Sequence, residues 1–310
     1  MSSDIQRAAE IIRNGGLVAF PTETVYGLGA DALNPLAVAR IFEAKDRPSF
    51  DPLIVHVPGL SEAMKLASAI PEKARRLAAK FWPGPLTLVL PKVPSVPDIV
   101  TSGLPSVAIR VPDHPLALEF LWEVACPIAA PSANPFGRVS PTTAQHVRDG
   151  LGDRVDLILD GGPCRVGVES TILSFLSDPP VLLRPGGISL EDLQSVIGPV
   201  TLDPHAREIP LAPGQLQNHY ATQTPLYLGE GSLTGRLGYL GMKMPVDPDS
   251  YERIEVLSAD GDLREAASHL FAALRRLDAA GLDALVALPV PDEGLGRAIN
   301  DRLFKASQKP

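Results

Sequence analysis

The sequence predicts an α/β protein of the α+β kind, with a mixed sheet in a first domain and a smaller α/β domain after it. Apolar, β-branched segments recur along the chain, and only some of them alternate with helical patterns, which favours a mixed sheet. The 310 residues suffice for about two domains of roughly 150 residues each. Between 200 and 225 the periodicity lapses amid several prolines. We therefore predict a first domain over 1–200, a linker over 201–224 and a second domain over 225–310.

Apolar periodicity, interrupted by glycine and proline, places the elements of the first domain. An apolar stripe over 5–12 indicates a helix that stops at Gly15-Gly16. Ser140 is the expected N-cap of a later helix, with Pro141 in its first position. In chain order, helices are predicted over 5–12, 35–44, 71–81, 116–124 and 141–150 and from 189 onwards, and strands over 17–20, 53–57, 86–90, 107–111, 127–131, 155–160, 170–175 and 181–184.

The second domain follows the polar linker and returns to regular patterns. Strands are predicted over 225–229, 236–241, 253–258 and 282–290, and helices over 263–281 and 296–307. This order of strands and helices is typical of a small Rossmann-like α/β domain.

Composition limits the classes of partner. The net charge is −8 and neither domain is basic, which argues against a protein that holds nucleic acid mainly through phosphates. Cys126 and Cys164 show no disulfide or metal spacing. The N-terminus lacks the pattern of a signal peptide, and the apolar runs are far shorter than the ~20 residues of a membrane span. We expect a cytoplasmic protein without a membrane partner.

Common cofactor motifs are missing from the sequence. Gly27-Leu28-Gly29 resembles the start of a dinucleotide fingerprint, but the third glycine is absent. There is no phosphate-binding loop of the GxxxxGK[ST] type. The histidines show no metal-ligand spacing, so no metal site is predicted.

Short polar clusters follow several predicted strands, where α/β folds often build their sites. Each cluster also has a purely structural interpretation, such as a polar turn or a solvated basic loop. For Ser140 that interpretation is helix capping, although the N-terminus of a helix is also a favourable site for a phosphate group. The clusters are 21–27 with Thr24; Lys45, Arg47, Asp51 and His56; Ser106 and Arg110; Ser132, Asn134 and Ser140; and Glu169, Ser170 and Thr171 with Arg184.

Arg110 is the most informative of these residues because it lies in an apolar strand. A buried guanidinium is costly unless it is paired, so we expect a carboxylate partner or a bound anion there. The clusters together supply cations and hydroxyls, with no nucleophile–base pair. Such a site suits phosphoryl or nucleotidyl transfer, in which positioning and charge stabilisation dominate.

Five motifs, in order, resemble the YrdC-like family of L-threonylcarbamoyladenylate synthases. They are FPTETVYGLGADA, KDRPSFDPL, WPGPLTLVL, APSANPFGRVSPTTA and GVESTIL. The later segments PGQLQNHYAT and GLGRAINDRLFKAS are similar to the two-domain branch of that family. The resemblance implies a twisted mixed sheet with a concave cavity. It also implies a nucleotidyltransferase that makes threonylcarbamoyl-AMP and pyrophosphate from L-threonine, bicarbonate and ATP.

Site residues follow from the resemblance motif by motif. The resemblance implies Lys45 and Arg47 as the catalytic cations. It implies that threonine is bound by Thr24, His56, Arg110 and Ser170, and ATP by Arg47, Asp51, Ser106, Ser132, Asn134, Ser140, Arg184 and Tyr220. Tyr220 lies in the linker, which we expect to close over the site. Asp51 departs from the amide common at its position, and its carboxylate would repel phosphates unless Mg²⁺ or Arg47 compensates it.

The resemblance also implies partners beyond the substrates. ATP brings Mg²⁺, and a downstream tRNA-modifying transferase takes the adenylate, with a weak or transient tRNA contact left open. Two other functions remain alternatives at this point. One is a module that binds double-stranded RNA or tRNA without turnover, and the other is a carbamoyl-transfer module like that of hydrogenase-maturation proteins.

Overall fold

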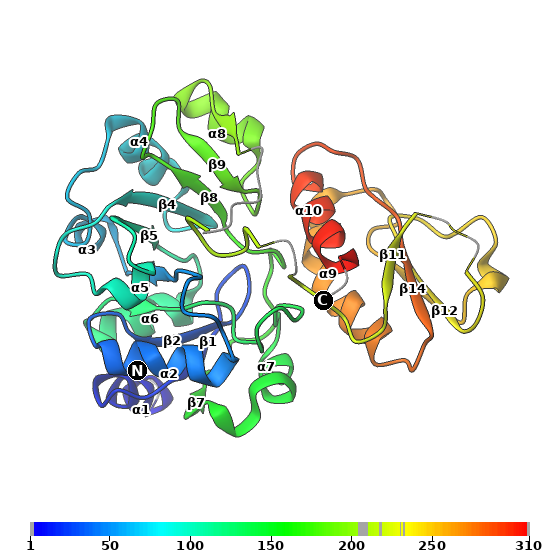
Figure 1. The fold of residues 1–310 in the computed structure, drawn as a ribbon, viewed down its shortest axis with the longest axis horizontal. Helices are drawn as coiled ribbons and strands as arrows, with labels where there is room; N and C mark the ends of the chain where they lie inside the picture. Colours follow the sequence, from blue (N-terminus) through cyan, green and yellow to red (C-terminus); the bar gives the residue numbers. More distant parts are fainter. Residues whose placement is uncertain (1–2, 204–209, 217–218, 230, 232, 309–310) are drawn as a thin grey trace.

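The computed structural model describes residues 3–203, 210–216, 219–229, 231 and 233–308, which form two sheets (Figure 1). The strands of the first sheet are β1 (Val18–Phe20), β2 (Gly27–Asp31), β3 (Ile54–His56), β4 (Leu86–Pro91), β5 (Ser106–Arg110), β6 (Ile128–Ala129), β7 (Leu157–Ile158), β8 (Thr171–Ser174), β9 (Val181–Arg184) and β10 (Thr201–Leu202). Their order across the sheet is β10-β9-β8-β4-β5-β3-β6-β2-β1-β7.

The first sheet is mixed, which confirms the predicted fold class. Strand β5 pairs antiparallel with β4 and parallel with β3, and β8 pairs parallel with β4 and antiparallel with β9. In the β3–β5 register His56 lies opposite Arg110. Two polar side chains from distant parts of the sequence are thereby placed next to each other.

Strand β2 is absent from the predicted elements because its two glycines weaken the strand pattern. The structure explains them by close packing between neighbouring strands. A Cβ atom at Gly29 would lie 2.8 Å from Cγ2 of Ile128 and 3.0 Å from a ring carbon of Phe20. A side chain at position 29 would therefore push β2 away from its neighbours.

Helices cover the first sheet near the predicted positions, with α3 and α5 as short additions. They are α1 (Ser3–Arg13), α2 (Pro35–Lys45), α3 (Leu60–Met64), α4 (Glu72–Phe81), α5 (Asp98–Thr101), α6 (Pro115–Val124), α7 (Ala144–Leu151) and α8 (Leu190–Ile197). The prediction of Ser140 as N-cap and Pro141 at N1 is wrong. Thr143 caps α7 by accepting a hydrogen bond from the His146 amide, because the Ser140 hydroxyl donates to Glu169 instead.

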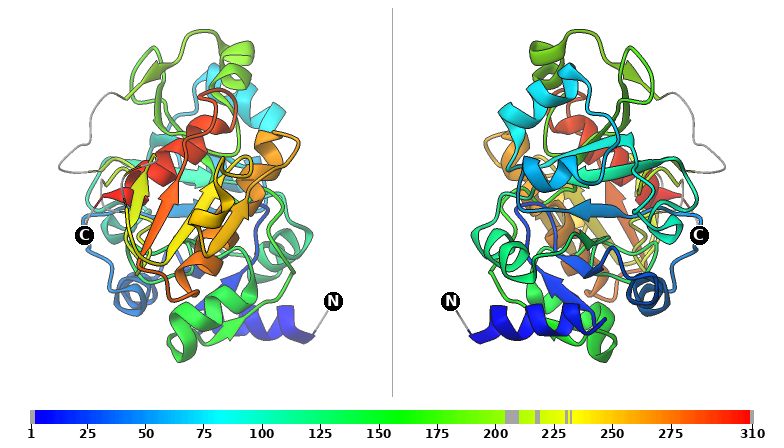
Figure 2. Two further views of the ribbon diagram at one scale, coloured as in Figure 1. Left: turned by 90° about the vertical axis from the view of Figure 1, so that its right-hand side faces the viewer. Right: turned by 90° about the vertical axis from the view of Figure 1, so that its left-hand side faces the viewer.

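The second sheet confirms the small Rossmann-like domain. Its strands are β11 (Leu226–Leu228), β12 (Leu237–Gly241), β13 (Arg253–Val256) and β14 (Ala284–Ala287), and its helices are α9 (Leu263–Asp278) and α10 (Gly296–Ser307). The strand order is β11-β14-β12-β13, and all the pairs are parallel. Figure 2 shows these strands side by side, with the first domain behind them in the left view.

Helices α9 and α10 lie between the second sheet and the first domain (Figure 1). Arg275 of α9 donates to the Val139 carbonyl, and Arg297 of α10 pairs with Glu191 of α8. The described part of the linker contacts both domains as well. The Ala221 amide donates to Gly137 of the first domain, and the Thr224 amide donates to Asp278 of α9. The second domain is therefore docked against the first.

Both cysteines are free thiols, Cys126 half-buried and Cys164 buried. Burial raises the pKa of each thiol to about 12, so both stay protonated at neutral pH and are poor nucleophiles. Among the described residues, we find no helix with the length and apolar character needed to cross a bilayer.

Candidate active site

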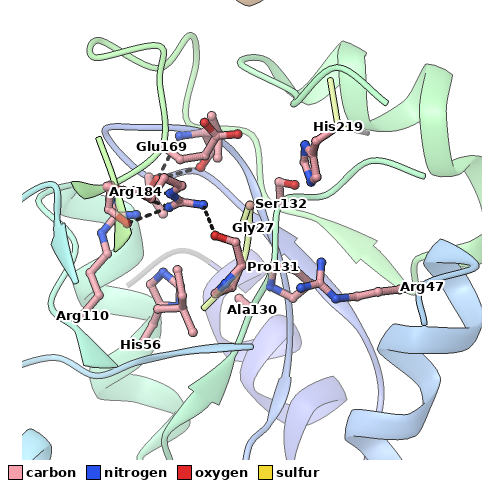
Figure 3. A pocket seen from close by; sticks show the side chains of 16 residues that line it. Gly27, Arg47, His56, Arg110, Ala130, Pro131, Ser132, Glu169, Arg184 and His219 are labelled. Atoms are coloured by element: carbon pink, nitrogen blue, oxygen red, sulfur yellow. Dashed lines mark hydrogen bonds between the residues drawn. The ribbon is translucent and has the colours of Figure 1, made fainter. Parts of the chain in front are cut away.

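A cavity lies at the strand ends of the first sheet, and three described residues of the linker form part of its wall. We call it the central cavity (Figure 3). Its lining is Thr22, Val25, Gly27, Arg47, Ile54, His56, Arg110, Ala130, Pro131, Ser132, Glu169, Ser170, Arg184, Pro213, Gly214 and His219. Six of the predicted site residues line it, namely Arg47, His56, Arg110, Ser132, Ser170 and Arg184. These six residues come from four of the five predicted clusters, and Thr22 of the remaining cluster, 21–27, also lines the cavity.

Arg110 and His56 form one end of the cavity, on adjacent strands. Arg110 pairs with the buried Glu23 at 2.7 Å, which confirms the expectation that this guanidinium has an anionic partner. His56 is buried, and burial together with the charge of Arg110 lowers its pKa to about 3. The imidazole is therefore neutral at physiological pH. This end of the cavity presents one compensated cation and one neutral ring.

Arg47 lies across the cavity from His56 and Arg110 (Figure 3). Its guanidinium pairs with Asp51 at 2.8 Å and donates to the Asp51 and Pro52 carbonyls. Burial raises the pKa of Asp51, and Arg47 opposes that shift. Asp51 is completely buried and lies outside the cavity lining. The Asp51 carboxylate is therefore compensated by Arg47, which is one of the two possibilities left open by the sequence. In return, Asp51 orients the Arg47 guanidinium.

Lys45 lies behind the lining rather than in it. Its ammonium donates to the carbonyl of Ser132, at 2.6 Å, and to that of Asn134. The Asn134 amide in turn donates to the Pro135 and Arg138 carbonyls. Burial, followed by the nearby charge of Arg47, lowers the Lys45 pKa well below its usual range. Lys45 thus fixes the loop that presents Ser132 to the cavity.

Arg184 joins the sheet to the linker. Its Nε and Nη2 atoms donate to the Ser170 carbonyl, and Nη1 donates to the Pro213 carbonyl. The Ser170 hydroxyl receives another bond from Nη2 at 3.2 Å and is 2.7 Å from the Thr87 hydroxyl. Arg184 and Ser170 therefore form one hydrogen-bonded unit in the wall of the cavity.

The other predicted residues lie outside the lining. The Thr24 hydroxyl is 2.8 Å from the Thr22 hydroxyl, and the Ser140 hydroxyl donates to Glu169 at 2.6 Å. Ser106 is buried at the start of β5, four residues before Arg110. Strand geometry separates these two positions by roughly 13 Å. Ser106 therefore lies well away from the Arg110 end of the cavity.

Tyr220 of the linker is completely buried and does not line the cavity. Its ring stacks on Phe271 of α9 with centroids 5.5 Å apart, and it contacts His219 at 4.1 Å. The backbone of Tyr220 has a φ of 63°, which is rare for a bulky residue. Its packing against the second domain holds that conformation and turns His219 toward the cavity.

Three polar lining residues have no role in the assignment made from the sequence, namely Thr22 and Glu169, which belong to the predicted polar clusters, and His219. Glu169 belongs to the motif that supplied Ser170, and His219 is the neighbour of Tyr220. Burial is the main cause that lowers the pKa of His219, to about 3. For Glu169, burial raises the pKa, but Arg302 and Arg184 outweigh it and lower the value to about 2. The signal for Glu169 is its place in a polar cluster beside Ser170, and the signal for His219 is its adjacency to Tyr220.

The fold and the site together define an α/β protein with a small, arginine-rich cavity, whose wall includes Pro213, Gly214 and His219 of the linker. Two family models match the chain. The model described as telomere recombination matches residues 10–186, and the model for the C-terminal domain of threonylcarbamoyl-AMP synthase matches residues 188–308. The chain belongs to the two-domain threonylcarbamoyl-AMP synthase family.

Relatives cover nearly the whole length. The threonylcarbamoyl-AMP synthases of Pyrococcus abyssi and Bacillus subtilis are each 46% identical, over 98% of this chain and 94% and 92% of theirs. The crystal structure of P. abyssi Sua5 complexed with L-threonine has a TM-score of 0.92 at 44% identity. It covers 98% of this chain and 94% of that one.

Proposed function

We propose that the protein forms threonylcarbamoyl-AMP and pyrophosphate from L-threonine, bicarbonate and ATP. The observation that carries this is the arrangement of the central cavity. One end holds Arg110, His56 and Ser170, Arg184 donates to Ser170, and Arg47 lies across the cavity. An amino acid carboxylate and a polyphosphate both need such cations. The structure of a relative bound to L-threonine supports the same substrate here.

The threonine end is assigned to Arg110, His56, Ser170 and Thr24. Arg110 is the partner for the threonine carboxylate, because a guanidinium has five N–H donors and Glu23 uses only part of them. The neutral His56 and the Ser170 hydroxyl then orient the rest of the amino acid. Because the imidazole is neutral, it neither repels the ammonium group of threonine nor competes with it for anionic partners.

The nucleotide end is assigned to Arg47, Arg184 and the loop that Lys45 holds. Ser132, Asn134 and Ser140 belong to that loop, and Asp51, Ser106 and Tyr220 complete the set proposed for ATP. Lys45 and Arg47 are the proposed catalytic cations. Lys45 acts through the loop and through its charge, since its ammonium already donates to two carbonyls, those of Ser132 and Asn134.

Substrate entry requires the linker to move. The central cavity measures about 40 Å³, whereas sites for ligands of nucleotide size are typically about 300–1,000 Å³. Pro213, Gly214 and His219 of the linker form part of its wall. Displacing these residues is the simplest way to admit ATP, and their return would exclude water from the reaction.

The reaction is proposed in two steps. The amine of threonine attacks bicarbonate-derived carbon, which forms a carbamate and releases water. A carbamate oxygen then attacks the α-phosphorus of ATP in line, and pyrophosphate leaves with the electron pair of the broken P–O bond. Arg47 and Lys45 stabilise the charge that spreads over the phosphoryl oxygens.

Mg²⁺ is assigned to the substrate side of the reaction. Within the described ranges no group of three or more His, Cys, Asp or Glu could hold a metal ion. The nucleotide phosphates are therefore the proposed ligands of Mg²⁺, which they would carry into the cavity. A downstream transferase that modifies tRNA is the proposed consumer of the adenylate, with any tRNA contact weak or transient.

Omitting the substrates one at a time tests the proposal. We expect the full-length protein to release pyrophosphate from ATP only when both L-threonine and bicarbonate are present, without any tRNA. The measurement is a coupled pyrophosphate assay in degassed buffer. Pyrophosphate release that ignores threonine would contradict the proposal, as would release that requires RNA.

A further inference from the structure

Arg302 of α10 is a completely buried arginine that reaches from the second domain into the first. Its Nε and Nη2 atoms both lie 3.0 Å from Oε2 of Glu169. Its Nη1 atom donates to the Pro185 carbonyl, just after β9, at 2.7 Å. Glu169 lines the central cavity. A residue of the second domain is therefore in direct contact with a wall of the site.

Glu169 needs this partner because of where it lies. It precedes Ser170, and its other oxygen accepts the Ser140 hydroxyl at 2.6 Å. The carboxylate thus ties together two segments of the cavity. A buried carboxylate without a cation would be expensive, and it would repel the phosphates of a nucleotide. Arg302 supplies the positive charge that compensates the Glu169 carboxylate, and it does so from the second domain.

Helix α10 also holds the linker. Lys305 donates to the Gly214 carbonyl at 2.7 Å and pairs with Asp301, which in turn pairs with Arg302. The Arg302 guanidinium lies over the Tyr220 ring, 5.4 Å from its centroid. One turn of α10 therefore contacts both a wall of the cavity and the segment that covers it.

Stability alone is a weak explanation for this arrangement. Buried ion pairs often contribute no more to stability than apolar residues of similar size would. The same helix makes a second pair to the first domain, Arg297 with Glu191, but that pair is partly exposed and neither residue lines the cavity. The buried charge is placed only where the helix meets the cavity.

We propose that Arg302 is a positioning residue of the active site, by which the second domain orients Glu169 and, through it, Ser140 and Ser170. This inference rests on the proposed function. The second domain then completes the site rather than merely stabilising the chain.

Substitutions at both ends of the pair test the proposal in the full-length protein. We expect Arg302→Met and Glu169→Gln each to lower the kcat of threonine-dependent pyrophosphate release, on the order of 100-fold for misplaced groups. Arg302→Lys should recover part of that loss. The double variant should lose little more than either single one, because both act on the same contact. Arg297→Met is the matched control and should retain wild-type kcat.

The pH profile separates positioning from a merely structural role. The charged groups facing Glu169 are Arg302 of α10 and Arg184 of β9, and the titratable groups beside it are His219 and Tyr220 of the linker, both neutral in the assay range. With Arg302 present, the low Glu169 pKa keeps the carboxylate ionised throughout the assay range. Removing Arg302 raises that pKa, so activity should fall as the pH drops through the new value. Glu169→Gln should show no such acidic limb.

The outcomes are distinct. Wild-type kcat and an unchanged pH profile in Arg302→Met would overturn the inference, as would equal losses in Arg302→Met and Arg297→Met. If Arg302→Met does not fold, Glu169→Gln decides, because it preserves shape: full activity in this variant overturns the inference. Failure of the proposed function would look different, since the unmodified protein would then show no threonine-dependent release.

Discussion

Replacing Arg47 by alanine is expected to reduce threonine-dependent pyrophosphate release on the order of 100- to 1,000-fold, the usual effect of losing one charge-stabilising donor. Arg47 lines the cavity, and Asp51 and two carbonyls hold its guanidinium in place. The loss should fall mainly on kcat, because the negative charge on the phosphoryl oxygens is redistributed during transfer. Steady-state kinetics with saturating threonine and bicarbonate measure it.

A second variant separates chemistry from folding. Arg47→Ala leaves the buried Asp51 carboxylate unpaired, which typically costs about 3–5 kcal/mol of stability. Adding Asp51→Asn removes that charge and should restore much of the unfolding free energy, measured by urea denaturation. The double variant should remain inactive. If activity returned together with stability, Arg47 would have only a structural role.

Replacing Arg110 by alanine is expected to raise the KM for L-threonine by roughly 100-fold, because a charged hydrogen bond to a carboxylate is worth up to about 3 kcal/mol. The KM for ATP should change far less. Arg110 lies beside His56 at one end of the cavity, across from Arg47. Initial rates over a threonine series at fixed ATP provide the measurement.

Glu23 provides the control for Arg110. The Arg110→Ala variant leaves the buried Glu23 carboxylate without its partner. Combining it with Glu23→Gln should restore the unfolding free energy but not the KM for threonine. An unchanged threonine KM in a folded Arg110→Ala variant would refute the assignment. A parallel rise in the KM for ATP would instead indicate a general distortion of the cavity.

The sequence predicts the fold class and most elements because apolar runs and glycine or proline breaks are local signals. Strand β2 was not predicted because Gly29 is required by contacts with Phe20 and Ile128, which only the folded sheet reveals. The cap at Ser140 was mispredicted for a related reason. Its hydroxyl is used by Glu169, 29 residues further along the chain.

For the site, composition and strand position identified the cations but not their partners. The need for an anion near Arg110 follows from burial alone, whereas the choice of Glu23 depends on sheet geometry. Arg302 was beyond sequence reasoning altogether. It lies 133 residues from Glu169 and in another domain, and an arginine in an amphipathic helix ordinarily faces solvent.

The product itself tests the central claim most directly. The full-length protein would be incubated with ATP, L-threonine and isotopically labelled bicarbonate, and the nucleotides analysed by mass spectrometry. We predict an adenylate in which one labelled carbon joins threonine to AMP, formed in equal amount with pyrophosphate. An adenylate of threonine without the label, or pyrophosphate release without any threonine-containing nucleotide, would contradict the account.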